Sequence, residues 1–197
     1  MGIPLIKKNQ QFTYTDYLSW NNPTERWELI NGNAYDMSPA PGTMHQNLSI
    51  ELSGIIWNFL KGKSCKVFAA PFDVRLPDNP DDPDNEIDNV VQPDLAVICD
   101  ESKLDEKGCK GAPDLIIEIL SPGTAKKDYR EKYNLYEIHG VREYWIVDPN
   151  GAVSVYNLQE NKCYNDGVIY EKIGIVKSTI IIGLEVSLKD LFAFGIS

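Results

Sequence analysis

An acidic residue in the middle of an apolar run is the feature that most constrains this chain. Residues 111–122 read Gly-Ala-Pro-Asp-Leu-Ile-Ile-Glu-Ile-Leu-Ser-Pro, a short β-branched run bounded by Gly and Pro that predicts a buried strand. Glu118 lies inside this run, between Ile117 and Ile119. Burying an unpaired charge costs more than one residue of packing returns, so Glu118 must be protonated, paired or bound to a cation.

A second acidic residue opens the preceding apolar run. Residues 92–99 read Gln-Pro-Asp-Leu-Ala-Val-Ile-Cys, so that Asp94 begins another expected strand. Alternation along the later strand places Asp114, Glu118 and Leu120 on one face. If the two strands are neighbours, Asp94 and Glu118 converge, and two close carboxylates repel unless a divalent cation lies between them. A few hard oxygen ligands with room for water favour Mg²⁺ or Mn²⁺ over zinc.

The segment after this strand can supply a cation of its own. The sequence predicts a helix with Thr124 as its N-cap, running to His139, and with Gly140 as its stop signal. The side chains spaced for one aromatic face are Tyr129, Lys132, Tyr133 and Tyr136, whereas Lys126, Lys127 and Arg130 fall elsewhere on the wheel. The tyrosines are expected in the core rather than on a base-stacking surface. Lys132 either pairs with Glu118, which would need no metal, or snorkels to water.

These motifs together resemble a known nuclease pattern. Pro93-Asp94, followed by Glu118 twenty-four residues on, resembles the PD-(D/E)xK nuclease superfamily. A finer pattern is similar to the Uma-type restriction endonuclease family within that superfamily. It consists of the sequence of residues 111–122, followed by Asp128, Lys132, Tyr136 and residues 140–149. Residues 27–32 and His45 match this family too, so the resemblance covers the chain roughly from Phe12 to Phe192.

The resemblance implies both a fold and an activity. The implied fold is α+β (α/β), a restriction-endonuclease-like mixed β-sheet core flanked by helices, with a β-rich C-terminal part. The implied activity is a metal-dependent DNA endonuclease that hydrolyses phosphodiester bonds, with Mg²⁺ or Mn²⁺ held by Asp94, Glu118 and Glu28. Lys132 and His45 complete the implied catalytic set by orienting water or phosphate. A homodimer is expected, because double-strand cleavage by one-site enzymes commonly needs two copies.

One position departs from the superfamily pattern. The pattern has Lys two residues after the acid, where this chain has Leu120. Either Lys132 supplies the amine from the following helix, or the domain is a catalytically inactive nuclease fold that serves as a binding or regulatory module. A nuclease acting on RNA or on nucleic-acid ends is a further alternative.

Several of these residues also have a purely structural interpretation. Asp94 can be a turn residue that follows a proline, and Asp114 is expected to serve strand-entry turn chemistry rather than ligation. Glu28 would otherwise be an ordinary hairpin residue. His45 would otherwise be a polar residue in the first turn of a helix.

Composition bounds the class of protein. The 197 residues, 43% apolar and 24% charged, predict one domain over 1–197 with a sizeable core, after a loose leader at 1–11. The net charge of −10 argues against nonspecific coating of nucleic acid, which needs clustered Lys and Arg. An expected acidic loop at 77–89 carries six of the 29 acidic residues, which concentrates much of this imbalance in one place.

Cysteine spacing and hydropathy predict the compartment. The four cysteines, at 65, 99, 109 and 163, form no CxxC pair, which favours reduced thiols. No signal-peptide pattern and no apolar run of about 18 residues occurs. A soluble, cytoplasmic protein is therefore expected.

The remaining pattern predicts the other elements. These are a short helix within 12–20, a hairpin at 27–37 turning at Asn31-Gly32, a helix at 43–61, strands at 67–76, 141–147, 152–156, 168–170 and 178–182, and a closing turn or short helix at 188–194.

Overall fold

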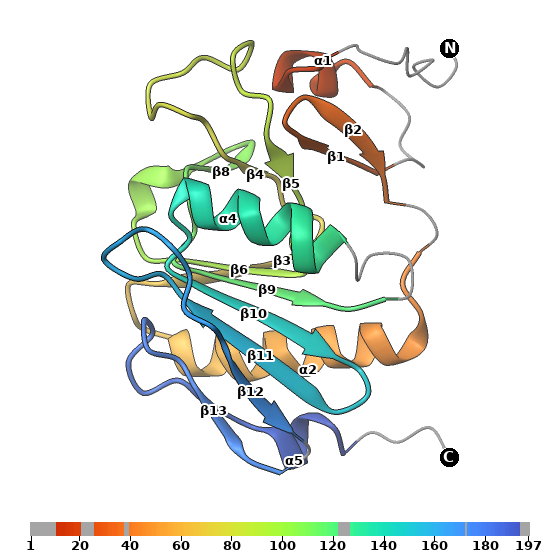
Figure 1. The fold of residues 1–197 in the computed structure, drawn as a ribbon, viewed down its shortest axis with the longest axis vertical. Helices are drawn as coiled ribbons and strands as arrows, with labels where there is room; N and C mark the ends of the chain where they lie inside the picture. The colour runs from red at the N-terminus through yellow and green to blue at the C-terminus, as the bar shows by residue number, and fades with distance from the viewer. Residues whose placement is uncertain (1–10, 21–25, 38–39, 122–126, 172, 194–197) are drawn as a thin grey trace.

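A mixed six-stranded sheet lies at the centre of the computed structural model, which describes residues 11–20, 26–37, 40–121, 127–171 and 173–193 (Figure 1). Its order is β12-β11-β10-β9-β6-β3. The strands are β3 (Lys66–Ala69), β6 (Leu95–Ile98), β9 (Leu115–Ile119), β10 (Glu143–Asp148), β11 (Ala152–Asn157) and β12 (Val168–Glu171). Only the β9–β10 pair within this sheet is parallel, and a parallel pair needs a crossover connection.

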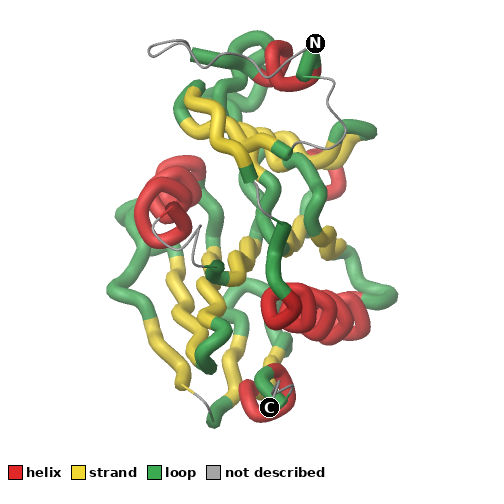
Figure 2. The backbone as a smooth tube through the Cα atoms, turned by 90° about the vertical axis from the view of Figure 1, so that its right-hand side faces the viewer, coloured by secondary structure: helices red, strands yellow, loops and turns green. Residues whose placement is uncertain are grey.

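Two helices cover opposite faces of this sheet (Figure 2). Helix α2 (Thr43–Leu60) packs on one face through Leu48, Leu52 and Ile56, whose spacing is the predicted helical period. Helix α4 (Tyr133–His139) belongs to the β9–β10 crossover and packs on the other face through Leu135 and Tyr136. The predicted helix-flanked mixed sheet is confirmed.

A second sheet adjoins the first and carries the predicted hairpin. Its order is β2-β1-β5-β4-β8-β7. Its elements, with the short helices beside it, are α1 (Tyr14–Leu18), β1 (Trp27–Ile30), β2 (Asn33–Asp36), β4 (Val74–Arg75), β5 (Val90–Val91), η1 (Glu101–Lys103), β7 (Leu104–Asp105) and β8 (Gly108–Lys110). Asn31 and Gly32 both have positive φ, 49° and 68°, as a two-residue turn matching the strand twist requires.

The strand predicted at 67–76 is wrong in its extent. It is two strands, β3 and β4, which belong to different sheets. Pro71 lies between them, and a proline has no backbone N–H to continue a ladder of hydrogen bonds. The chain therefore leaves one sheet and enters the other at this point.

The strand predicted at 178–182 is also wrong. The C-terminal strands are β13 (Ile175–Lys177) and β14 (Glu185–Ser187), followed by helix α5 (Leu188–Leu191). Ser178, Thr179 and Ile180 instead donate hydrogen bonds to Oε2 of Glu143. The β-branched run resembles a strand, but its polar groups are used by a buried carboxylate rather than by a neighbouring strand.

A disulfide joins Cys65 to Cys99, so the expectation of reduced thiols is wrong for this pair. Lys66 lies opposite Ile98 in the antiparallel β3–β6 pair, and the next position outward brings the two cysteines together. Their separation of 34 residues along the chain conceals this proximity. Cys109 and Cys163 are free, and burial raises the pKa of the Cys109 thiol to about 12. No helix among the described residues is both long and apolar enough to span a bilayer.

Glu143 is expected to be a main determinant of stability, because Trp145 and the 178–180 segment all donate to its fully buried carboxylate. The variant Glu143→Ala leaves several buried donors unpaired, so the free energy of unfolding should fall by about 3 kcal/mol or more. Urea denaturation measures this change. The exposed Glu160→Ala serves as the control and should stay within about 0.5 kcal/mol of the unaltered protein. Equal midpoints for the two variants would contradict the anchoring role.

Candidate active site

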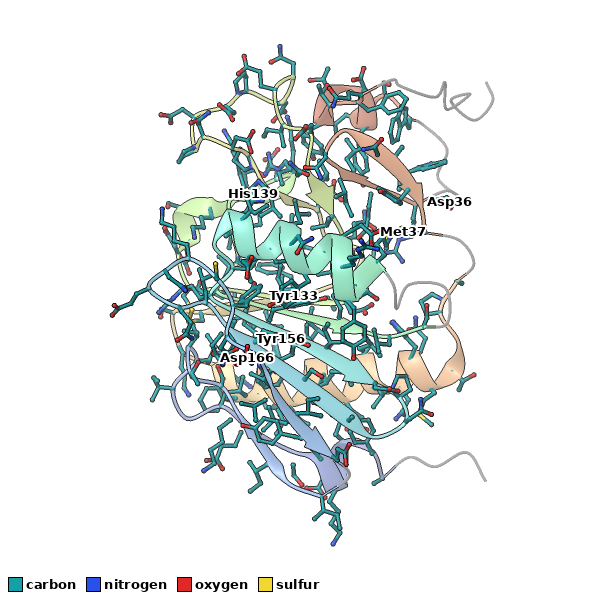
Figure 3. The ribbon with its side chains drawn as sticks, in the orientation of Figure 1. Asp36, Met37, Tyr133, His139, Tyr156 and Asp166 are labelled. Carbon is teal, nitrogen blue, oxygen red and sulfur yellow. A yellow bond between two sulfur atoms is a disulfide. The ribbon has the colours of Figure 1, made fainter. Side chains whose placement is uncertain are left out.

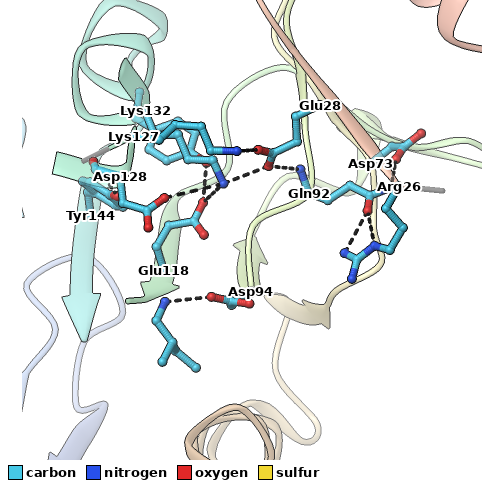
Figure 4. A network of polar contacts seen from close by, with 12 residues as sticks. Arg26, Glu28, Asp73, Gln92, Asp94, Glu118, Lys127, Asp128, Lys132 and Tyr144 are labelled. Carbon is cyan, nitrogen blue, oxygen red and sulfur yellow. Dashed lines mark hydrogen bonds and ion pairs between the residues drawn. The ribbon is translucent and has the colours of Figure 1, made fainter. Parts of the chain in front are cut away.

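Neighbouring strands bring the two predicted acids to one point (Figure 4). Leu95 lies opposite Ile117 in the antiparallel β6–β9 pair, and the same register puts Asp94 opposite Glu118. Asp94 Oδ2 accepts a hydrogen bond of 2.7 Å from the backbone N–H of Ile119. The two carboxylates therefore share the end of the sheet and the face covered by α4, as the alternation predicts.

Lys132 reaches these acids from the crossover. Its Nζ lies 2.8 Å from Oε1 of both Glu28 and Glu118, and 3.9 Å from Oδ1 of Asp128. The side chain is only 3% exposed, so it does not snorkel to water. Burial opposes its charge, but the surrounding carboxylates outweigh burial and raise the pKa of Lys132 well above its ordinary value. The ammonium group is therefore a permanent part of the site.

A π-helical turn, η2 (Asp128–Lys132), places these side chains. The predicted N-cap Thr124 lies outside the described residues. A regular α-helix would put Tyr129 on the core face, but in the structure Asp128 and Lys132 are buried and Tyr129 is 45% exposed. The wider π turn explains this difference, because it shifts the side chains around the helix relative to the 3.6-residue period.

Glu28 enters from β1 of the other sheet and is fully buried. Its Oε1 accepts from the Gln92 backbone N–H at 3.0 Å and from Lys132, while Lys127 Nζ lies 2.6 Å from Oε2. Burial favours the neutral form, but the two lysines outweigh it and lower the pKa of Glu28. Glu28 is therefore ionised and holds both lysines in place.

Two further residues of the site, Gln92 and Lys127, are not indicated as site residues by the sequence. The Gln92 side chain accepts from Arg26 at 2.9 Å and donates to Asp73 at 2.8 Å and to Tyr17 at 3.0 Å. Its partners lie far away along the chain, so no local pattern reveals them. Lys127 precedes Lys132 by five residues, which is the hydrogen-bond spacing of a π turn and the only sequence signal that could have indicated it.

His45 approaches Asp94 from the first turn of α2. Its Nε2 lies 3.2 Å from Asp94 Oδ2. Burial disfavours the imidazolium, but the hydrogen bond and the charge of Asp94 outweigh burial and raise the pKa of His45. Its buried Nδ1 has no hydrogen-bond partner among the described residues. His45 therefore occupies one oxygen of Asp94 and keeps its other nitrogen available.

The described site has more carboxyl groups than lysines, and His45 with its raised pKa adds a third basic group. Its carboxylates are Glu28, Asp94, Glu118 and Asp128, and its lysines are Lys127 and Lys132. Burial raises the pKa of Glu118 to about 8; Lys132 opposes this rise, whereas Asp128, Asp94 and Glu28 add to it. Without a further cation, Glu118 therefore holds a proton at neutral pH.

Two carboxylate oxygens remain open in this arrangement. Glu118 Oε1 accepts from Lys132 and from the Tyr136 hydroxyl at 2.7 Å, and Asp94 uses Oδ2. No hydrogen bond or ion pair from the described residues reaches Glu118 Oε2 or Asp94 Oδ1. Two such oxygens fit Mg²⁺, which is commonly held by one or two carboxylates with water and phosphate completing its shell.

The side chains that could bind a metal ion directly are few. The described residues contain no group of three or more His, Cys, Asp or Glu side chains arranged to hold a metal ion. Glu28, the third predicted ligand, uses both oxygens on Lys132, Lys127 and the Gln92 N–H. The contacts of Glu28 therefore fit a residue that positions the two lysines.

Asp114 and Leu120 share the Glu118 strand face but have structural contacts. Asp114 accepts from the Cys99 backbone N–H at 2.8 Å and from Arg142 at 3.1 Å, which agrees with the expected strand-entry role. Leu120 is buried in the apolar cluster beneath α4. The amine that the superfamily pattern has at Leu120 is present in space as Lys132.

Comparisons with known proteins agree with this architecture. The Uma2 family model, described as "Putative restriction endonuclease", matches residues 14–188. An uncharacterized protein of Synechocystis sp. is 24% identical over 141 residues, which are 71% of this chain and 70% of that protein. The crystal structure of "a putative nuclease belonging to DUF820" from Anabaena variabilis has a TM-score of 0.73 at 23% identity, covering 92% of this chain and 98% of that chain. The predicted restriction-endonuclease-like fold is thereby confirmed.

The proton on Glu118 makes stability depend on pH. Between the ordinary pKa of 4.5 and the folded value of about 8, the folded chain keeps a proton that the unfolded chain has released. Without added metal, the free energy of unfolding should therefore fall as the pH rises through this window, relative to Glu118→Gln. Gln still accepts from Lys132 and Tyr136 but does not titrate. Urea denaturation at several pH values tests this, and parallel curves for the two proteins would show that Glu118 is ionised throughout.

Proposed function

The chain belongs to the Uma2 family, and from that premise we propose that it is a metal-dependent endonuclease hydrolysing phosphodiester bonds in DNA. One observation carries the proposal: Asp94 and Glu118 face one another across β6 and β9, each with one open oxygen, beside a buried lysine. Paired carboxylates can hold the ion that metal-assisted phosphodiester hydrolysis uses, and an amine beside them can offset charge on the phosphate.

Asp94 and Glu118 are the residues that would hold Mg²⁺ or Mn²⁺. When bound, the ion would supply a lowered pKa for its water and neutralise charge on the phosphate. Glu118 must lose its proton to take part, so the pKa near 8 makes metal binding and deprotonation coupled events. Once Glu118 is ionised, the four carboxylates Glu28, Asp94, Glu118 and Asp128 outnumber Lys127, Lys132 and the His45 imidazolium by one, which supports a further cation.

Lys132 would provide the fixed positive charge of the site. Its ammonium lies 2.8 Å from Glu118 and is held in place by Glu28, which is itself held by Lys127 and the Gln92 N–H. From this position it can orient a water or offset charge on a phosphate oxygen. Lys127, with 15% of its side chain exposed, lies nearer the surface and suits a contact with the phosphate.

His45 would position Asp94. By occupying Oδ2 together with the Ile119 N–H, it would leave Oδ1 of Asp94 for the ion. Its raised pKa favours the imidazolium, which keeps Asp94 ionised. Glu28 and His45 thus act through the residues that they hold.

A second candidate function is a catalytically silent binding or regulatory module. The observation that favours it is the bridging position of Lys132, which gives both Glu28 and Glu118 a partner without any metal. The net charge of −10 is consistent with it, because nonspecific DNA binding needs clustered basic residues. A metal titration separates the two candidates.

One catalytic centre cuts one strand at a time. A homodimer is therefore part of the proposal for double-strand cleavage. Plasmid substrates report on this directly, because a lone centre nicks a circle whereas paired centres linearise it. The proposed cytoplasmic setting has the Cys65–Cys99 disulfide against it, because disulfides are rare in the cytosol.

The endonuclease proposal predicts metal-dependent conversion of supercoiled plasmid to nicked or linear forms. Asp94→Ala and Glu118→Ala each remove one open oxygen and should lower the rate by about 10²-fold or more. Glu160→Ala, an exposed acid in a turn, should cleave like the unaltered protein. Agarose gels with Mg²⁺, Mn²⁺ or EDTA measure the products. Equal nicking by all four proteins would indicate a contaminating nuclease.

The metal site predicts stabilisation by Mn²⁺. A ligand that binds only the folded chain adds about 2.7 kcal/mol at a hundred times its Kd, so the thermal midpoint should rise as Mn²⁺ is added. Asp94→Ala should remove this rise. A midpoint of the unaltered protein that stays flat up to millimolar Mn²⁺ would favour the silent module, in which Lys132 is the only cation that Glu118 needs.

A further inference from the structure

Three tyrosines from three elements form a partly exposed cluster beside the candidate active site. Tyr129 from η2 is 45% exposed, whereas Tyr133 from α4 and Tyr156 from β11 are half-buried. The rings of Tyr133 and Tyr156 meet edge to face, with centroids 5.0 Å apart, and Figure 3 shows both between α4 and β11. Burial raises the pKa of the Tyr156 hydroxyl, and the nearby Tyr129 raises it further. Tyr129 is therefore counted with the other two rings. We call these three residues the tyrosine surface.

The tyrosine surface is continuous with the catalytic residues. Tyr129 follows Asp128, and Tyr133 follows Lys132, so the same turns carry both sets of side chains. Across the sheet, Tyr156 pairs with Tyr144, and Ile146, two residues further along β10, pairs with Glu118. The usual strand spacing and rise put Tyr156 about 12 Å from Glu118 on the same face. Nucleotides that flank a phosphate bound at Asp94 and Glu118 can therefore reach these rings.

The packing of α4 does not require Tyr129. Leu135, Tyr136, Tyr144 and Tyr164 fill the apolar cluster between this helix and the sheet, and all are buried. Tyr129 projects outward instead, because the π turn gives the inward positions to Asp128 and Lys132. The ring of Tyr129 is therefore available for contact with a partner outside the chain.

The chemistry around the rings selects the partner. Glu137 and Asp166 both act on the Tyr133 hydroxyl, after burial, to raise its pKa, and they would repel a phosphate on this surface. Stacking of a base on an aromatic ring needs no positive charge, and every base has a flat face to offer. This suits a chain whose net charge is −10.

We propose that the tyrosine surface stacks unpaired bases of single-stranded DNA next to the phosphate that is cut. The proposal rests on the proposed endonuclease function for the position of that phosphate. It narrows the substrate from DNA in general to single strands or unpaired segments, because bases in a duplex stack on each other and do not present their faces. Affinity would come from the bases and only in small part from phosphate contacts.

Binding in EDTA tests this inference without any cleavage. A fluorescein-labelled 20-mer should bind the unaltered protein at least about tenfold more tightly as a single strand than as a duplex, by fluorescence anisotropy. Tyr129→Leu should weaken single-strand binding about tenfold, whereas Tyr129→Phe keeps the ring and the affinity. Trp57→Leu is the matched control, since this ring is 54% exposed on α2, which covers the other face of the sheet. Its affinity should not change.

The salt dependence separates stacking from phosphate binding. The logarithm of the single-strand affinity should fall only shallowly with the logarithm of salt concentration, since few lysines take part. A Tyr129→Leu protein with unaltered melting temperature and unaltered affinity would overturn the inference, as would equal affinity for duplex and single strand. Tighter binding of the matching RNA would overturn its assignment to DNA. Loss of cleavage in Glu118→Ala addresses the catalytic proposal alone, so the two can fail independently.

Discussion

The ammonium group of Lys132, held between Glu28 and Glu118, is the interaction on which the rest of the site depends. Glu28 belongs to the small sheet and Glu118 to the central one, so the two ion pairs of 2.8 Å join the two sheets through the crossover helix. All three groups are buried, and removing one partner would leave a charge without compensation. The orientation of the small sheet relative to the central one is thereby tied to the chemistry of the site.

Much of the fold could be predicted from local patterns. The period of α2, the Asn31-Gly32 turn and the apolar run around Glu118 each depend on residues close together in the sequence. The errors arose where distant residues decide the outcome. The 178–182 run resembles a strand, but Glu143 accepts its hydrogen bonds, and Cys65 meets Cys99 only because β3 pairs with β6.

The candidate site divides in the same way. A buried acid must have a partner, so Glu118 could be found from its apolar neighbours, and alternation placed Asp94 on the same face. Lys127 and Gln92 could not be found, since the first depends on a π turn and the second on contacts with distant segments. Helical periodicity also placed Tyr129 in the core, although its ring is half in solvent. A single π turn accounts for two of these three errors.

Moving the amine from the strand to the helix changes what controls it. A lysine at position 120 would be held by the backbone directly after β9, whereas Lys132 depends on the packing of α4 and on Glu28. Burial raises the pKa of Glu118 although Lys132, which also pairs with Glu28, lowers it, so Glu118 holds a proton at neutral pH without a further cation. Arrival of a divalent ion would release that proton and ionise the second acid beside Asp94. In the proposed metal-dependent enzyme, binding of the ion and ionisation of Glu118 would occur together, while Leu120 packs in the apolar core beneath α4.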